Sequence, residues 1–207
     1  MGVKAYISAI TNGRGMASSN LYAVYFTGGP IPSMTGTYGA IDTPVKGQNI
    51  TKVGERVLLF CDEVNLPGVQ FATGTVNRYA GAAPVNYPTN PIYNDLQLSF
   101  MCDAEMQPVK FLNDLQQKMY SIIGSGKDKQ YRMNYPNEYQ CSIIIEKRER
   151  GTTGEVEKLS LRYTLNGAWP YSVDAIPLSY GSSQLVKVTA NFYYHNWDVE
   201  KFSLQTI

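Results

Sequence analysis

The most constraining feature of the sequence is a pair of alternating runs between Leu159 and Trp197. A period of two places successive side chains on opposite faces, so each run predicts a strand with one buried and one wet face. The apolar positions are Leu159, Leu161, Tyr163 and Leu165 in the first run and Val186, Val188, Ala190, Phe192 and Tyr194 in the second. Together the runs predict a hairpin whose polar face looks away from the core.

The residues between the runs predict where the first strand ends. Asn166 and Gly167 tolerate positive φ, and Pro170, after Ala168 and Trp169, cannot donate to a sheet ladder. We therefore expect a structural turn built from Gly167, Trp169 and Pro170. A second turn, at Gly181-Ser182-Ser183, leads into the second run.

Length and charge limit the classes of protein that this chain can be. Its 207 residues fit one domain, residues 1–207, which can bury a core without disulfides or metal. Only 17% of the residues are charged, the formal net charge is +1, and 16 residues are Tyr. This balance favours an all-β protein with semi-polar surface and argues against electrostatic binding of nucleic acid. It also leaves a monomer poorly protected against association.

The cysteines and the hydropathy pattern bear on compartment. Cys61, Cys102 and Cys141 form an odd set without a CxxC pair, and Cys102 continues a preceding apolar alternation. A small buried side chain is therefore a better interpretation of Cys102 than a metal ligand, and we expect synthesis in a reduced, intracellular compartment. No apolar run approaches the ~20 residues that span a bilayer, so we expect a soluble protein.

Further strands and one helix are predicted along the chain. An apolar stripe at helical spacing, from Val109 to Ile122, predicts a helix that Asp103 caps, Pro108 opens and Gly124-Ser125-Gly126 ends. The predicted strands are 20–27, 57–61 and 139–147, with a second hairpin made by Val69–Tyr79 and Asp95–Cys102 around a loop containing Pro84, Pro88 and Pro91. The charged run Glu146–Arg150 with Gly151–Gly154 predicts a solvated hairpin tip.

Two segments lack sustained periodicity. Residues 1–19 contain Tyr6, Ile7 and Ile10, and they are either a loose terminus or a short apolar arm that packs on a neighbour. Residues 28–52 are rich in Gly, Pro, Ser and Thr, which predicts a long insertion loop of the functional or mobile kind.

The sequence lacks the patterns of catalytic and cofactor sites. His195 is the only histidine, and no G-x-S-x-G, P-loop, H-E-x-x-H or G-x-G-x-x-G pattern occurs. The neighbouring carboxylates Asp62-Glu63 and the pair Asp103/Glu105 are better explained as capping or solvated groups. We therefore expect no enzyme, no metal and no cofactor; a hydrolase that uses His195 is the weakest alternative.

A ligand-binding module is an alternative from a different class. A small β-barrel carrier or carbohydrate-binding module would also contain hairpins and many tyrosines. Such a protein places aromatic side chains around a pocket mouth, for which Tyr79, Tyr87 and Tyr93 are the candidates. Thermal stabilisation by a ligand, without assembly, would identify it.

Several short motifs follow one another in a fixed order along the chain. They are Asn20-Leu21-Tyr22-Ala23-Val24, Phe60-Cys61 with Asn65-Leu66-Pro67-Gly68-Val69, Lys110-Phe111-Leu112-Asn113-Asp114, Gly167-Ala168-Trp169-Pro170-Tyr171-Ser172-Val173, Ile176 to Ser179, and the final set Val186, Val188, Tyr193 and Trp197. This ordered set resembles the tail-tube proteins of contractile-tailed, T4-like bacteriophages, and the resemblance covers about Asn20 to Asp198. The opening strand departs from the family pattern because Ser19 replaces a proline.

This resemblance implies a fold and a set of partners. The fold is a mainly β, antiparallel sandwich or partial barrel with one α-helix, in which two long hairpins complete an inter-subunit barrel in a hexameric ring. The rings stack into a tube inside the virion tail, assembled in the host cytoplasm. The implied partners are the chain itself, the tail sheath, tape-measure, baseplate and tail-terminator proteins, and viral DNA that passes without sequence-specific binding. A baseplate-proximal tube-initiator ring of the same fold is the nearest alternative.

Two departures from the plainest family members are the insertion at 28–52 and the C-terminal extension Phe202–Ile207. They would decorate the outside, bind the sheath, or mark a specialised ring.

The hairpins also predict self-association on physical grounds. Monomers protect strand edges with charge, but these runs carry little charge, and closure into a ring removes the edges. The polar positions expected to line the lumen or meet a neighbour are Gln70, Thr73, Thr75, Asn77, Arg78, Asp95, Gln97, Ser99, Lys187, Thr189, Asn191 and His195. Positions expected in ring stacking are Tyr6, Ile7, Ile10, Tyr87 and Tyr93. Few basic residues on such a wall would allow DNA to pass without adhering.

Overall fold

A computed structural model describes residues 3–4, 17, 19–28, 61–76, 83–124, 129–149, 158–178 and 185–202. The expected arm at 1–19 and the expected loop at 28–52 lie almost entirely outside these ranges. So do Tyr6, Ile7, Ile10, Asn77, Tyr79 and Arg78, the predicted strand at 57–60, and the tip at 150–154.

The described part of the chain is mainly β, with helix α3 and the one-turn helix α4. The helices are α3, Gln107–Gln117, and α4, Pro136–Tyr139. The strands are β1 Tyr22–Thr27, β2 Cys61–Val64, β3 Val69–Val76, β4 Val85–Tyr93, β5 Leu96–Met101, β6 Tyr120–Ile123, β7 Gln130–Met133, β8 Cys141–Glu149, β9 Lys158–Val173, β10 Lys187–Tyr193 and β11 Asn196–Lys201. The prediction of a mainly β, antiparallel fold is confirmed.

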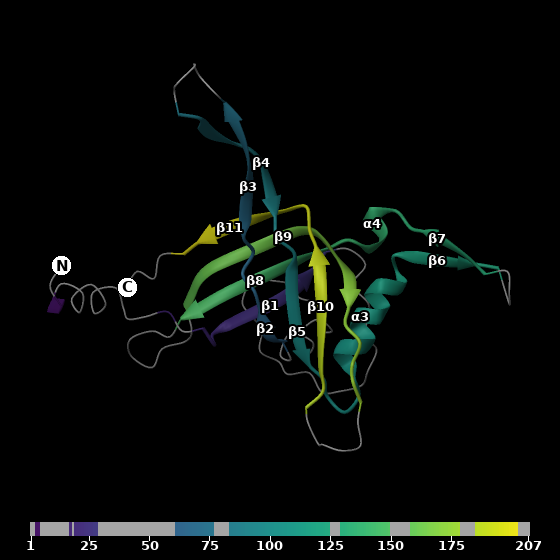
Figure 1. The fold of residues 1–207 in the computed structure, drawn as a ribbon. Coiled ribbons are helices and arrows are strands. Elements are labelled where there is room, and N and C mark those ends of the chain that lie inside the picture. The colour runs from purple at the N-terminus through teal and green to yellow at the C-terminus, as the bar shows by residue number, and fades with distance from the viewer. Residues whose placement is uncertain are drawn as a thin grey trace.

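In the part of the chain that the structure describes, seven strands form one antiparallel system, in the order β1-β8-β9-β10-β5-β2, with β11 also paired to β9 (Figure 1). Strand β9 is 16 residues long and belongs to two layers. Its first part pairs with β8 and β11, and its last residues, from Trp169 to Val173, pair with β10. The β3–β4 and β6–β7 hairpins are separate two-stranded sheets that project from this body in different directions.

The core lies between the layers and is closed by α3. The ring of Phe26 contacts Phe111 from α3 at 5.1 Å and Phe192 from β10 at 5.8 Å, so three elements meet at one point. Burial of such aliphatic and aromatic side chains supplies the main stabilisation of the body. The core comprises Val24, Phe26, Leu96, Leu98, Phe100, Phe111, Leu112, Leu115, Cys141, Ile143, Ile145, Leu165, Ala168, Val188, Ala190 and Phe192.

The alternation in the sequence assigned the buried faces correctly. In β10, Val188, Ala190 and Phe192 are buried, whereas the residues between them are half-buried or exposed. In β5, Leu96, Leu98 and Phe100 are buried in the same way. The strands predicted at 20–27, 95–102 and 139–147 are all present, with boundaries shifted by a few residues.

The predicted pairing of the second hairpin is wrong. Strand β3 pairs with β4, from Val69 opposite Tyr93 to Val76 opposite Val85, and not with the strand that follows Asp95. Strand β5 lies instead in the body, between β10 and β2. Pro88 and Pro91, expected in a loop, lie within β4. A two-stranded ribbon tolerates them because each of its strands has one free edge, where no N–H is needed.

The predicted end of the first C-terminal strand is also wrong. Strand β9 continues through Asn166, Gly167, Trp169 and Pro170, and Pro170 lies opposite Phe192 of β10. Gly167 does adopt positive φ, +66°, as its residue type indicated. It bends the strand at the point where β9 leaves one layer for the other. The predicted hairpin therefore forms between β10 and the last part of β9, whereas the first part of β9 pairs with β8 and β11.

The helix is shorter than the apolar stripe predicted. It ends at Gln117, and Ile122 lies in β6, which starts at Tyr120. Asp103 does act at the helix start, because its Oδ1 accepts a hydrogen bond from the Gln107 N–H at 2.8 Å. Pro108 occupies the first turn as expected. No helix among the described residues is long and apolar enough to cross a membrane.

Candidate functional site

The polar face of the layer β2-β5-β10 brings together the largest group of predicted site residues. Thr189 lies opposite Ser99, and Asn191 lies opposite Gln97, so their side chains share one face. The Ser99 and Thr189 hydroxyls are 3.1 Å apart and form a hydrogen bond. Lys187 continues the row on β10. Five of the predicted lumen positions therefore form one continuous surface of hydroxyl, amide and ammonium groups.

The charged side chains of this face are Lys187 and the carboxylates Asp62, Asp95 and Glu63, the last of which is exposed and lies opposite Ser99. The Lys187 ammonium forms a salt bridge with the Asp62 carboxylate from β2. The Tyr171 hydroxyl donates a hydrogen bond to Asp95 Oδ2 at 2.8 Å. That hydrogen bond, with a smaller contribution from desolvation and the Asp95 charge, raises the pKa of Tyr171 to about 12. The described part of the face thus consists of neutral groups, one cation neutralised by a carboxylate, and the further negative charges of Asp95 and Glu63.

A row of aromatic rings borders the polar face at the β9–β10 junction. Tyr193 stacks on Tyr171 with ring centroids 4.1 Å apart, and Trp169 contacts Tyr193 at 5.5 Å. Tyr139 extends the row by an edge contact with Trp169 at 6.2 Å. Trp169 therefore holds α4 and two strands together. Trp169 was predicted as part of a structural turn, but in the structure its side chain packs these elements against one another.

His195 lies at the corner between β10 and β11, away from the hydroxyl row. Its Nε2 is 2.9 Å from Gln140 Nε2, and its backbone N–H donates to the Asn166 carbonyl at 2.9 Å. The imidazole covers Gly167, where an added Cβ would lie 2.2 Å from His195 Cδ2. These contacts place the His195 side chain against β9 at Gly167.

The remaining predicted positions lie on the projecting β3–β4 hairpin. Thr73 and Thr75 share one face, where the Thr75 hydroxyl donates to Asn86 Oδ1 at 2.9 Å. Gln70 points to the opposite face, which follows from the alternation along β3. Tyr87 covers Gly74, and the Tyr93 ring lies 6.0 Å from that of Tyr194. The roles of Tyr87 and Tyr93 in ring stacking stay predictions.

Among the described residues of one copy, the sheet remains open. Strands β1 and β2 stand at the two ends of the strand order, and no ladder joins them among the described residues. The Tyr22 hydroxyl donates to the Cys61 carbonyl at 3.1 Å, so the two end strands are bridged by a side chain. Burial, followed by the charges near Cys61, raises the pKa of Tyr22 to about 12 and keeps this donor protonated.

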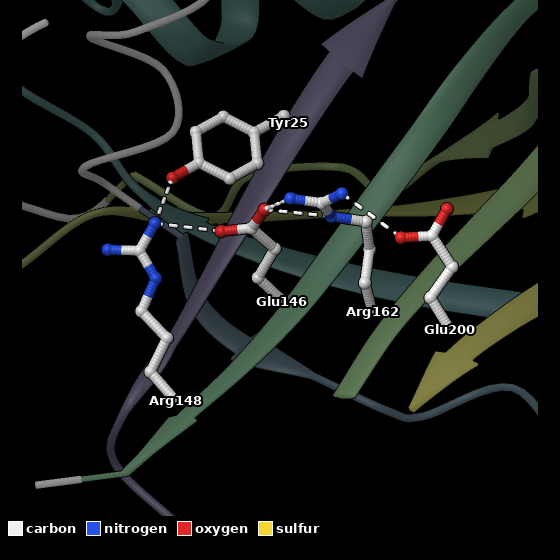
Figure 2. Close-up of polar contacts among 5 residues, drawn as sticks. All are labelled: Tyr25, Glu146, Arg148, Arg162 and Glu200. Atoms are coloured by element: carbon white, nitrogen blue, oxygen red, sulfur yellow. Dashed lines mark hydrogen bonds and ion pairs between the residues drawn. The ribbon is translucent and has the colours of Figure 1, made fainter. Parts of the chain in front are cut away.

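An ion cluster on the other layer was missed by sequence analysis (Figure 2). Glu146 was expected in a solvated tip, but its side chain is only 5% exposed. Its two carboxylate oxygens accept hydrogen bonds from Arg148 at 2.8 Å and from Arg162 at 2.9 Å. Arg148 also donates to the Tyr25 hydroxyl at 2.6 Å, and Arg162 donates to Glu200 at 3.1 Å. The cluster ties β1, β8, β9 and β11 together.

The pairing of Glu146 had only a weak signal in the sequence. Alternation places Glu146 out of phase with the buried Ile143 and Ile145, which indicates the outer face and not its burial. Arg162 lies directly opposite Glu146 across the ladder, a contact that depends on the β8–β9 register. Within the part of the chain that the structure describes, no group of three His, Cys, Asp or Glu residues could hold a metal ion.

Comparison with solved structures places this fold among the proteins of contractile injection systems. The chain is similar to a chain in the six-fold symmetrised baseplate of the anti-feeding prophage, with a TM-score of 0.56, 13% identity, and 90% of this chain and 97% of that chain covered. It is also similar to a chain in the sheath–tube complex of an extracellular contractile injection system, PVC, with a TM-score of 0.54, 9% identity, and coverage of 98% and 100%. A third match, from the tube-terminating cap of the anti-feeding prophage, has a TM-score of 0.54 and 9% identity, and covers 90% of this chain and 92% of that chain.

The family follows from the sequence. A family model described as phage tail tube protein matches residues 17–200, and the chain therefore belongs to the phage tail tube protein family. The resemblance noted from the ordered motifs is confirmed. A search of curated proteins finds no match to this chain. Membership of this family assigns the chain a structural role in a tube.

Proposed function

We propose that this chain is the structural subunit of a contractile tail tube, in which hexameric rings stack into a channel that delivers viral DNA into the host. The observation that carries the proposal is an open antiparallel sheet, with a polar face built around hydroxyl and amide groups, in a member of the tail tube family. An open sheet needs partners for its edges, and a ring of identical copies supplies them without exposing new ones.

The hydroxyl and amide face is the proposed channel wall. Thr189, Ser99, Asn191 and Gln97 carry no charge, and Lys187 is neutralised by Asp62. DNA adheres to proteins mainly through cations that displace counterions from its phosphates, so a wall without free cations lets it pass. On this view Thr73, Thr75 and Gln70 meet the neighbouring subunit along the β3–β4 hairpin.

The proposed partners are those that a tube subunit contacts in a contractile tail. They are other copies of this chain, the sheath around the tube, the tape-measure protein, the baseplate at one end and the tail terminator at the other. The chain acts without catalysis or a cofactor, in a virion that is assembled in the host cytoplasm. The insertion 28–52 and the arm 1–19 are proposed contacts with these partners or with adjacent rings.

A tube-initiator ring at the baseplate is the second candidate. The observation that favours it is the similarity to a chain in a structure described as a baseplate. Copy number separates the two functions, because an initiator forms one ring whereas a tube subunit is repeated along the whole tail. Quantification of the chain relative to the sheath protein in purified particles distinguishes them.

Electron microscopy of the concentrated, purified protein tests the proposal. Hollow rods or stacked rings of uniform diameter are expected in negative stain. A dispersed monomer at high concentration would contradict it. Ligand-dependent stabilisation of such a monomer would instead support the small β-barrel module.

A further inference from the structure

The β6–β7 hairpin has one wholly apolar face. Tyr120 lies opposite Met133 and Ile122 lies opposite Tyr131, and residues that are directly opposite in an antiparallel pair share a face. The rings of Tyr120 and Tyr131 make an edge contact at 5.6 Å on this face. The reverse face carries Ser121, Ile123, Gln130 and Arg132. The hairpin is therefore an amphipathic ribbon, which needs a covering surface on one side only.

That apolar face is uncovered in the single copy. Tyr131 is 68% exposed, Met133 is 70% exposed and Ile122 is 51% exposed. The hairpin points away from the body (Figure 1). A two-stranded hairpin is marginal in water by itself, and contiguous exposed apolar surface on a soluble chain marks a contact site.

The base of the hairpin is fixed to the body, so its direction is defined. The Asn134 N–H donates to the Met119 carbonyl at 2.9 Å, and the Asn134 side-chain amide donates to the Lys118 carbonyl at 2.9 Å. Ser121 donates from its hydroxyl to Asn134 Oδ1 at 2.7 Å. These bonds hold the ribbon against the end of α3. A pre-positioned apolar ribbon loses little conformational freedom when it docks.

We propose that the apolar face of β6–β7, formed by Tyr120, Ile122, Tyr131 and Met133, packs on a second copy of this chain. The inference rests on the proposed self-assembly and names one contact that it uses. The face carries no charge, so a second copy need supply no ionic complement to it.

The chain also carries a surface that can receive the ribbon. On the β3–β4 hairpin, alternation and the observed register place four exposed apolar side chains on one face, together with Gln70, which lies opposite Ile92. They are Val76, Val85, Tyr87 and Ile92. The two hairpins leave the body in different directions (Figure 1). They cover each other's apolar faces between two copies, as a heterologous contact that closes rings or continues tubes.

A matched pair of substitutions on β7 tests this contact. Tyr131→Asp places a carboxylate on the apolar face, and Gln130→Asp places the same group one residue earlier, on the reverse face. Both positions are exposed, so both variants should keep the wild-type unfolding midpoint. The measured quantity is the protein concentration at which half of the chain sediments as rings or rods.

We expect Tyr131→Asp to raise that concentration by about a hundredfold, because an unpaired carboxylate in an apolar contact costs about two factors of ten in affinity. Gln130→Asp should change it by less than about threefold. Assembly of Tyr131→Asp at the wild-type concentration would overturn the inference and leave the proposed tube function intact. Loss of binding to purified sheath protein without loss of assembly would also overturn it. Failure of the wild-type chain to assemble would contradict both.

Discussion

The body and the projecting hairpins use apolar side chains in opposite ways. In the body, Phe100, Phe111 and Phe192 are fully buried by residues of the same chain. In the hairpins, Phe71, Tyr131 and Met133 are more than half exposed. The core of the body is therefore covered within one copy, whereas the hairpins leave apolar side chains that only a contact outside the subunit can cover. The comparison separates residues that hold the subunit together from residues that hold subunits to one another.

The largest expected effect comes from a core truncation set against a hairpin truncation. Phe192→Ala removes a ring that packs on Phe26 at 5.8 Å, and it should lower the free energy of unfolding by about 3–5 kcal/mol. Phe71→Ala, in the 57% exposed position on β3, should lower it by less than about 0.5 kcal/mol. Urea denaturation of the dispersed subunit measures both. Equal losses would show that the hairpin is part of the cooperative body.

Two substitutions in the cluster around Glu146 measure how much its ion pairs stabilise the body. Glu146→Gln removes the carboxylate shared by Arg148 and Arg162 and should cost about 2 kcal/mol, since both cations are only partly exposed to water. Glu200→Gln is the matched control, because the Glu200 side chain is 58% exposed and its pair with Arg162 should contribute about 0–0.5 kcal/mol. The same urea titration compares them. A cost at position 146 no greater than at position 200 would contradict the buried role.

A smaller effect is expected at the bend of β9. Gly167→Ala combines positive φ, +66°, with an added Cβ 2.2 Å from His195 Cδ2, and it should cost about 1–2 kcal/mol. The double variant Gly167→Ala/His195→Ala removes the steric part and should recover roughly half of the loss. Thermal unfolding of the two variants measures the difference. An unchanged loss in the double variant would assign the whole effect to the backbone conformation.

The prediction with the smallest expected effect concerns thiol labelling and requires no substitution. Burial raises the pKa of Cys61 and of Cys141 to about 12, so almost no thiolate exists at pH 8. Iodoacetamide should modify neither thiol in the folded subunit at pH 8, and both in denaturant, as read by mass spectrometry. The neutral thiols are favoured in the folded state, so this contribution to stability is complete below the ordinary thiol pKa and is lost as pH rises towards 12. Rapid native labelling of Cys141 would show that the body opens locally.

The sequence predicted the strands and their buried faces better than it predicted which strands pair with one another. Alternation around Leu98 and Ala190 identified which side chains are buried, because a strand's own period decides that. The polar row of Ser99 and Thr189 was predicted on that basis, and the structure places the two opposite each other. The partner of β3 was predicted wrongly, because hydrogen-bonding partners are chosen between segments far apart in sequence. Pro88 and Pro91 led to the prediction of a loop, but both lie in β4, because a two-stranded ribbon tolerates proline at its free edges.

What the sequence determined by itself was local: which residues alternate, that Pro108 lies in the first turn of a helix, and which ordered motifs mark the tail tube family. Only the tertiary structure decided that β9 passes through Gly167 into a second layer, that Glu146 is enclosed by two arginines, and that β6–β7 presents a bare apolar face. The physical reason is that periodicity acts within a segment. Pairing, ion contacts and exposure depend on which segments meet, and that choice is made by the whole chain at once.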